Sequence, residues 1–479
     1  MKTNWLVTIL MAIAMLVWLV GCEGPEGPAG AQGDQGEQGD PGDPVAQYTY
    51  LGDDASTCGH CHGDVVETWS ETGHSHAWDS LDPEDQANLY CVQCHTTGFD
   101  AEVAYGDTVV VTPGPDVHGF DDYYPPVTAE DEMRAGMLEN VQCEACHGSM
   151  GPTIYDHEPI VNFNTGLVDD MDPSMCSKCH EQVEEWQESG HGMVFEHHGF
   201  VDQEEFDDEW NRSSCGACHT GEGFIGDNDP NFPDPWYPED AHLIGCQTCH
   251  DPHDDTNPHQ LRNVDDYTVL YDAEEAATFT GYGGAQTCVQ CHHARRNTDN
   301  VVGQIENGYA HFGPHGSPQM DMFVGSGSYE IEGYEYEREH SHQMFDMLDD
   351  NESCVTCHME MRDHGDPLGW KGGHDFEPTP ATCSACHVVP DDFDYHGEPS
   401  DLVALADQLI TAIGVDPEYL GNTDSTTVEQ RMAGYAYVFF MNDGSNGIHN
   451  PEYARSLLEN ALDFIETANA AGNGAIVQK

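Results

Sequence analysis

The chain has 479 residues, and its 13 Lys and Arg stand against 88 Asp and Glu, a formal net charge of −75. Because nucleic-acid binding depends on cations that contact phosphates, this balance argues strongly against nucleic acid as a partner. Hydrophobic residues make up only 38%, a low share for a globular chain of this length. The 19 Cys and 29 His are abundant by contrast, and they predict an interior that is not built on aliphatic side chains.

The first residues predict export and a lipid anchor. An apolar run from Trp5 to Val20 is too short for a stable membrane span. It ends in Leu19-Val20-Gly21-Cys22, which resembles the lipobox of bacterial lipoproteins. We therefore expect a signal peptide over 1–21 and a diacylglycerol on Cys22; the alternative is an ordinary signal peptide with a chance cysteine. The residue after Cys22 is Glu23, whereas an Asp at this position tends to retain lipoproteins at the inner membrane. An outer-membrane location is therefore favoured, with the protein facing the periplasm or the cell surface.

Residues 22–44 hold the lipidated cysteine and seven Gly-X-Y triplets that run from Gly24 to Pro44. Glycine at every third position is what a collagen triple helix requires, because only Gly fits at its axis. The acidic side chains in these triplets would repel one another across three strands. A solvated tether is therefore favoured over a trimerising stalk. Either form spaces the remaining chain away from the lipid.

The motif C-x-x-C-H occurs nine times between residues 58 and 387. Two thiols at this spacing reach the two vinyl groups of one haem, and the adjoining His becomes the proximal ligand of its iron. Disulfides would not explain nine histidines at one fixed place, and zinc sites made of paired C-x-x-C would not need them. The sequence thus predicts nine covalently bound c-type haems. The motifs, numbered 1 to 9 in chain order, are Cys58, Cys61 and His62; Cys91, Cys94 and His95; Cys143, Cys146 and His147; Cys176, Cys179 and His180; Cys215, Cys218 and His219; Cys246, Cys249 and His250; Cys288, Cys291 and His292; Cys354, Cys357 and His358; and Cys383, Cys386 and His387.

The other 20 histidines are enough to give every iron a second, distal imidazole. Two segments share a pattern, Trp69 to His74 and Trp186 to His191, and both are typical of short helices that end in Gly-His. A straight helix would carry His191 about 16 Å from His180, and so to a neighbouring haem. For any single candidate, a surface or hydrogen-bonding role is the alternative. The candidate distal ligands are His74, His157, His191, His253, His259, His311, His315, His340, His374 and His449, with His342, His364 and His396 as further candidates.

The C-terminal region, 400–470, contains no cysteine, and its pattern is helical. Three amphipathic runs are expected: one capped by Ser400 and ended by Gly414, a second from Val428 to Phe439, and a third that begins at Asn450-Pro451. We interpret their apolar stripes as packing faces. His449 lies between the second and third runs, where a helical pair could lower it onto a haem. Residues 471–479 are a tail.

These features are similar to the multihaem cytochrome c superfamily, which includes pentahaem nitrite reductase, hydroxylamine oxidoreductase and octahaem tetrathionate reductase. The resemblance covers nearly all of 45–470, and the stretch Gly447-Ile-His449-Asn450 implies a distal-ligand role for His449. Two departures stand out. No C-x-x-C-K motif of the nitrite reductase kind is present, and Lys371 is the one lysine placed to act as a ligand.

The expected fold is mainly α with extensive irregular loops. Residues 45–399 would form a nonahaem cytochrome c region whose core consists of packed haems, because about 40 residues per haem cannot bury each ring, and 400–470 would add a C-terminal helical hairpin.

The favoured function is electron transfer through nine haems, in anaerobic respiration or extracellular electron transfer, with periplasmic or outer-membrane cytochromes as redox partners. Bis-His ligation suits this role because it lowers the potential. The alternative is a reductase of a nitrogen or sulfur compound at one open or Lys-ligated haem, so the sequence leaves the question of enzymatic activity open. A subunit of a cytochrome filament is a further alternative, and a homo-oligomer stays open with it.

Overall fold

The computed structural model describes residues 50–53, 55–99, 104–105, 108–109, 118–148, 173–193, 213–228, 242–271, 277–339, 342, 353–360, 373–388 and 392–472. All of them belong to one unit, Gln47–Lys479. The expected signal peptide over 1–21 and the tether over 22–44 lie outside the described residues. So does almost all of the expected tail.

Short helices joined by irregular loops make up most of the described chain before residue 390. Strand is confined to two antiparallel pairs, β1 (Ala104–Tyr105) with β2 (Thr108–Val109) and β3 (Tyr267–Thr268) with β4 (Thr278–Phe279). The prediction of a mainly helical chain with little strand is therefore confirmed. The helices are α2 (Gly63–Trp69), α3 (Leu89–Val92), α4 (Phe120–Tyr123), α5 (Ala129–Met137), α6 (Cys143–His147), α7 (Gln182–Glu188), α10 (Ser213–His219), α11 (Gly221–Asn228), α12 (Cys246–Cys249), α13 (Ala285–Val289), α14 (Thr298–Asn307), α15 (Gln319–Val324) and α16 (Ser353–His358).

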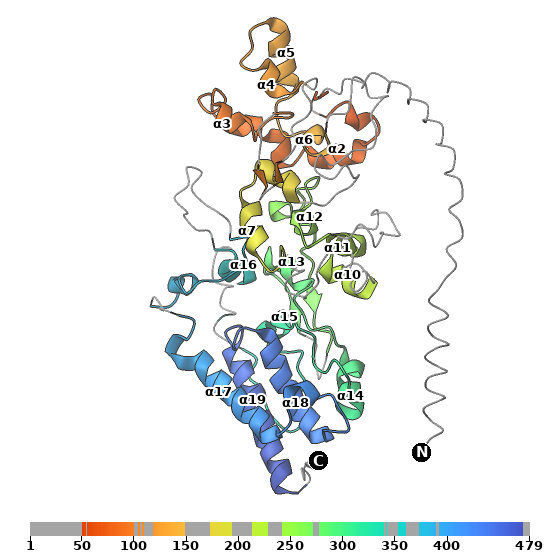
Figure 1. The fold of residues 1–479 in the computed structure, drawn as a ribbon, viewed down its shortest axis with the longest axis vertical. Helices are drawn as coiled ribbons and strands as arrows, with labels where there is room; N and C mark the ends of the chain where they lie inside the picture. Colours follow the sequence, from red (N-terminus) through yellow and green to blue (C-terminus); the bar gives the residue numbers. More distant parts are fainter. Residues whose placement is uncertain are drawn as a thin grey trace, which may run out of the picture. The chain divides into compact units, whose positions relative to one another are not determined.

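Three longer helices follow, α17 (Glu398–Ile413), α18 (Val428–Asp443) and α19 (Pro451–Ala470), and Figure 1 shows them side by side in blue. Thr427 and Gln430 form a capping box at the start of α18. The Asn450 side chain accepts a hydrogen bond from the Tyr453 amide and so caps α19. The expected cap at Ser400 is wrong, because α17 begins two residues earlier, behind Gly397, and the Ser400 hydroxyl donates to Asp394 instead.

The largest apolar core lies among these three helices and extends to α14 and α15. Its fully buried members include Leu402, Leu409, Tyr435, Phe439 and Leu458. Two smaller clusters lie earlier in the chain, one around Phe120 and one around Phe279. Side chains thus supply a continuous core in the last part of the chain and only local clusters before it.

The two tryptophan segments differ in one respect from the sequence prediction. Both Trp69 and Trp186 are buried, but their helices α2 and α7 end at Trp69 and Glu188, before the Gly-His pairs. His74 instead lies in a 3₁₀ turn, Gly73–His76, and His191 in a turn behind Ser189. Because the helices stop early, a straight helical path from His180 does not position His191.

Arg431 connects the helical bundle to the segment that follows motif 7. Its guanidinium is buried and donates to the carbonyl oxygens of Ile305 and Glu306, in the last turn of α14, at 2.7 and 3.1 Å. These carbonyls have no partner within their own helix. The contact therefore satisfies a helix end and joins α14 to α18.

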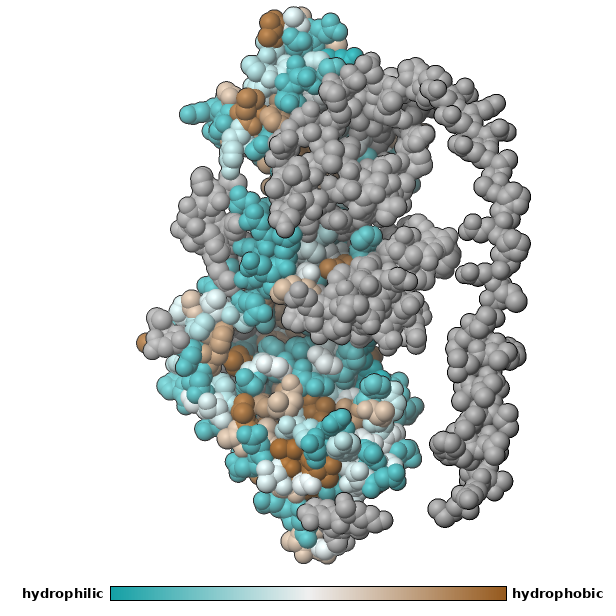
Figure 2. All heavy atoms as spheres, in the orientation of Figure 1, coloured by the Kyte–Doolittle hydropathy of each residue, from teal (hydrophilic) through white to brown (hydrophobic). Residues whose placement is uncertain are grey.

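The surface agrees with the composition. Hydrophilic residues cover most of the described surface that Figure 2 shows. Within the described part of the chain, no helix is both long and apolar enough to cross a membrane.

Truncating a core side chain of α18 should destabilise the bundle. Phe439 is fully buried, and its replacement by Ala removes apolar contacts and leaves a cavity. We expect Phe439→Ala to lower the free energy of unfolding by about 3–5 kcal/mol, measured by denaturant titration of the helical signal. Met441→Ala, on an exposed face of the same helix, should change it by about 0.5 kcal/mol or less. Equal effects of the two substitutions would contradict this assignment of the core.

Candidate haem-ligating site

Seven of the motif histidines face a second histidine across a short gap. The ring centres of each pair lie 6.0–6.4 Å apart, whereas the angles between ring planes range from 8° to 87°. The pairs are His180 with His74 (6.0 Å), His147 with His253 (6.0 Å), His292 with His191 (6.1 Å), His219 with His315 (6.2 Å), His358 with His449 (6.2 Å), His250 with His374 (6.4 Å) and His387 with His342 (6.4 Å).

This spacing fits a metal held between two imidazoles. Nitrogens that bind one metal from opposite sides at about 2.0–2.1 Å stand about 4 Å apart, which separates the ring centres by roughly 6 Å. A direct hydrogen bond would bring the nitrogens to about 3 Å, and the ring centres correspondingly closer. The wide range of ring angles also argues against stacking as the cause. The residues present therefore fit a haem iron with two histidine ligands.

Hydrogen bonds orient several of these rings. The Nδ1 atoms of His250, His342 and His358 each lie 2.7–2.9 Å from a backbone carbonyl oxygen, those of His259, Ile448 and Phe376. A carbonyl can only accept, so Nδ1 carries the proton and Nε2 keeps its lone pair. That is the tautomer a haem ligand requires.

Burial keeps most of these imidazoles neutral. It lowers the pKa of His147 and of His191 to about 4, and it also lowers the pKa of His74, His180, His250, His292, His342 and His358. A histidine with a lowered pKa is unprotonated at neutral pH. Its lone pair is then available to a metal.

The pKa of His449 shifts in the direction opposite to those of these eight histidines. Burial lowers its pKa, but the charge of Asp443 and a hydrogen bond to it outweigh burial, and the net shift is upward. Its Nδ1 lies 2.6 Å from Oδ1 of Asp443, whose side chain is fully buried. This contact also fixes Nδ1 as the donor and directs Nε2 toward His358.

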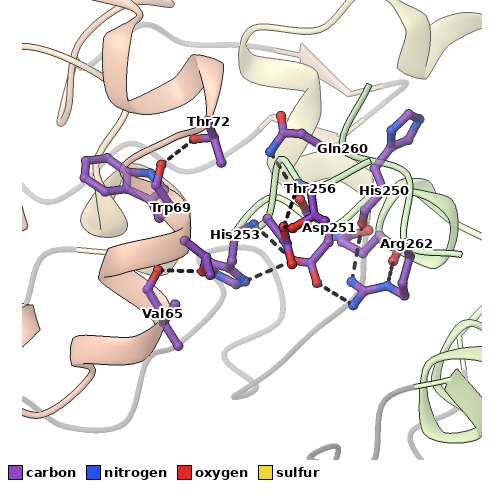
Figure 3. Close-up of polar contacts among 12 residues, drawn as sticks. Val65, Trp69, Thr72, His250, Asp251, His253, Thr256, Gln260 and Arg262 are labelled. Carbon is purple, nitrogen blue, oxygen red and sulfur yellow. Dashed lines mark hydrogen bonds and ion pairs between the residues drawn. The ribbon is translucent and has the colours of Figure 1, made fainter. Parts of the chain in front are cut away.

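A different arrangement surrounds His253, shown in Figure 3. Its Nδ1 lies 3.4 Å from Oδ1 of Asp251, and the other oxygen of that carboxylate accepts from Arg262 at 2.7 Å. The charge of Arg262 and hydrogen bonds to His253 outweigh burial and lower the pKa of Asp251 to about 2. The carboxylate is thus ionised, and its charge is shared between a cation and the histidine.

The turn between α18 and α19 reaches four of the pairs. Asn442 donates to the carbonyl oxygen of His315, and Asp443 accepts from His449. The carbonyl of Ile448 accepts from His342, and the Gln319 amide joins the turn to the ring of His292. One short segment thus orients ligands of motifs 5, 7, 8 and 9.

Contacts between cysteines show which motifs are neighbours. The thiol of Cys94 in motif 2 donates to the carbonyl oxygen of Lys178 in motif 4, and the thiol of Cys218 in motif 5 donates to that of Gln290 in motif 7. Interactions between thiols link motifs 1 and 3, 2 and 4, 3 and 4, 4 and 6, 5 and 7, 6 and 7, 7 and 8, and 8 and 9. The attachment points form a connected series, 1-3-4-6-7-8-9, with motif 2 beside motif 4 and motif 5 beside motif 7.

Some predicted ligands are not in such pairs. Among the described residues, His62 and His95 face no second imidazole, and the rings of His259 and His311 face no motif histidine. His157 and His340 lie outside the described residues, as do His364 and Lys371. The sequence favours His340 over His342 as a candidate distal ligand, and the spacing of these residues contains nothing that would favour His342 instead.

Replacing His449 tests the pairs directly. We expect His449→Met to leave haem attachment intact, because no motif changes, while one haem acquires a His-Met ligand set with a higher potential. Redox titration and the ferric absorption spectrum should show one displaced centre. His396→Ala, at an exposed ring that packs on Tyr395, is the matched control and should change neither. A His449 variant identical to the wild type would refute ligation by this residue.

One family model and three solved structures are similar to parts of this chain. The family model of outer membrane cytochromes described as MtrC/MtrF-like, domains II/IV, matches residues 51–228. Among solved structures, the outer cell wall cytochrome OcwA is similar over 87% of this chain and 99% of its own, at 16% identity and a TM-score of 0.49. The undecahaem cytochrome from the S-layer of Carboxydothermus ferrireducens is similar over 89% and 70%, also at 16% identity, with a TM-score of 0.48. Cytochrome c nitrite reductase from Desulfovibrio desulfuricans covers 55% of this chain and 66% of its own, at 16% identity and a TM-score of 0.31.

No curated protein matches the sequence. The repeated C-x-x-C-H motifs, the facing histidine pairs and the family match over 51–228 nevertheless agree with one another. Together they support a multihaem cytochrome c, and the family match itself covers residues 51–228.

Proposed function

We propose that this protein is an electron carrier that binds nine c-type haems, most or all of them between two histidines, at the outer surface of the cell. The seven facing histidine pairs carry this proposal. A bound haem supplies an iron that takes up and releases one electron. Two histidines that fill both axial positions leave no place for a substrate and lower the potential, as a carrier requires.

The order of the attachment points supports transfer along the chain. Each motif has at least one neighbour whose cysteines interact with its own. Several distal histidines follow another motif closely: His253 follows motif 6 and pairs with motif 3, and His191 follows motif 4 and pairs with motif 7. The same short segments that attach one haem would therefore ligate another, which fixes sites two steps apart in the series relative to one another.

The location follows from two features. The family matched over 51–228 consists of outer membrane cytochromes, and Cys22 stands at the end of a lipobox-like sequence. We infer a lipid anchor at Cys22 and a tether over 22–44 that carries the cytochrome region away from the membrane. Redox partners would then be periplasmic or outer-membrane cytochromes, in anaerobic respiration or extracellular electron transfer.

Haem counting and spectroscopy test the carrier function. The purified protein should contain nine haems by mass spectrometry and by the pyridine haemochrome assay. Its ferric spectrum should be wholly low-spin, because two imidazoles on each iron produce a strong ligand field. A high-spin fraction near one in nine would contradict the carrier and favour the alternative, a reductase with one open or Lys-ligated haem. A count below nine would show that one motif stays empty.

The anchor has its own test. Cys22→Ser removes the thiol that would receive the lipid, so the protein should move from the membrane fraction to the soluble fraction. Fractionation with haem staining measures this change. Ser70→Ala, far from the lipobox, is a control that should stay in the membrane fraction. Retention of the Cys22 variant in the membrane would refute lipidation at this residue.

A further inference from the structure

The carboxylate of Asp443 occupies a place where a negative charge is unfavourable. Asp443 is the last residue of α18, and the carbonyl end of a helix carries a partial negative charge. Its side chain has no exposed surface. Among the described residues, its carboxylate contacts the ring of His449 and the amide and hydroxyl of Ser445, and it forms no ion pair with Lys or Arg.

Burying an unpaired carboxylate costs several kcal/mol, so its environment must supply a compensating positive charge. His449 is the one described group that can do so. A neutral imidazole offers only an N–H dipole, whereas a protonated one carries a full positive charge, and the raised pKa of His449 favours that form when no metal is bound. An imidazole bound through Nε2 to a ferric iron would instead carry part of the positive charge of the metal. The burial of Asp443 is thus compatible with His449 as a haem ligand, on which the proposed function rests.

Five other paired histidines have neutral or compensated partners. His250, His342 and His358 donate to backbone carbonyls, and the Nδ1 of His292 lies 3.3 Å from the Gln319 amide oxygen. His253 faces a carboxylate at the longer distance of 3.4 Å, and Arg262 neutralises that group. Compared with these five, His449 has the closest and least compensated negative charge at its Nδ1.

We propose that Asp443 is a positioning residue that lowers the reduction potential of the haem attached at Cys354 and Cys357. A carboxylate on Nδ1 makes the imidazole a stronger electron donor and orients its ring. A negative charge near the iron also stabilises the ferric state over the ferrous state, because the ferric state has one more positive charge. Both effects shift the potential downward.

The position of this haem in the series determines how a lower reduction potential would affect electron transfer. Motif 8 neighbours motif 7 on one side and motif 9 on the other. An electron that moves between motifs 7 and 9 along this series passes motif 8. If the haem at motif 8 has a lower potential than its neighbours, electron transfer to it is unfavourable and electron transfer away from it is favourable, in either direction. Asp443 would therefore control how often an electron resides on this haem.

Asp443→Asn tests the proposal, because Asn keeps the shape, can accept from His449 and can donate to Ser445. At one fixed pH, we expect nine haems, a low-spin ferric spectrum, and one couple shifted upward. The ratio of ferric to ferrous at that centre should fall at least tenfold at a fixed potential, about 59 mV for one electron. Asp251→Asn is the matched control, and its shift should be smaller because Arg262 already offsets that charge.

A second variant protects the test against misfolding. Ser445→Ala removes a hydroxyl that donates to Asp443, so more negative charge remains for His449 and the same couple should shift downward. An unchanged potential in both Asp443→Asn and Ser445→Ala would overturn the proposal, as would equal shifts in Asp443→Asn and Asp251→Asn. If His449→Met changes one centre and Asp443→Asn changes none, only the role of Asp443 fails. If neither changes any centre, ligation by His449 fails as well.

Discussion

Two imidazoles that face each other across a gap the size of one metal ion are the contact on which the described structure depends. Each pair joins segments that lie far apart in sequence, as His74 and His180 do, or His358 and His449. Before residue 390 the apolar clusters are small and separate. In a chain with 38% hydrophobic residues, the proposed ligand pairs would supply long-range connections that a side-chain core supplies in an ordinary domain.

The helical bundle at the C-terminal end is instead held together by a continuous apolar core of side chains. Arg431 joins this bundle to the segment that follows motif 7. Its turn between α18 and α19 presents Asn442, Asp443 and Ile448 to the ligands of several motifs. A conventionally packed body can hold such groups with little positional freedom. The bundle is thus the rigid element against which four histidine pairs are oriented.

Sequence alone could predict the motifs and the helical character, because thioether spacing and amphipathic periodicity are local properties. It could not predict the pairing. His253 follows motif 6 closely, yet it faces His147 of motif 3. Nor could it predict that α7 would end before Gly190, since the straight-helix argument for His191 assumed regular backbone through that glycine. The role of Asp443 was equally hidden, because an acidic residue is ordinary in a chain with 88 of them.

The position of His449 also sets an order in time. A chain is synthesised with its N-terminus first, and its early segments can fold before the later ones arrive. His74 and His180, or His147 and His253, can meet while the later motifs are still to come. His358 has to wait for a partner that follows the last motif and precedes only α19. Ligation at motif 8 would then be a late step in maturation, and a chain cut short between His387 and His449 would keep all its attachment cysteines yet lack this closing contact.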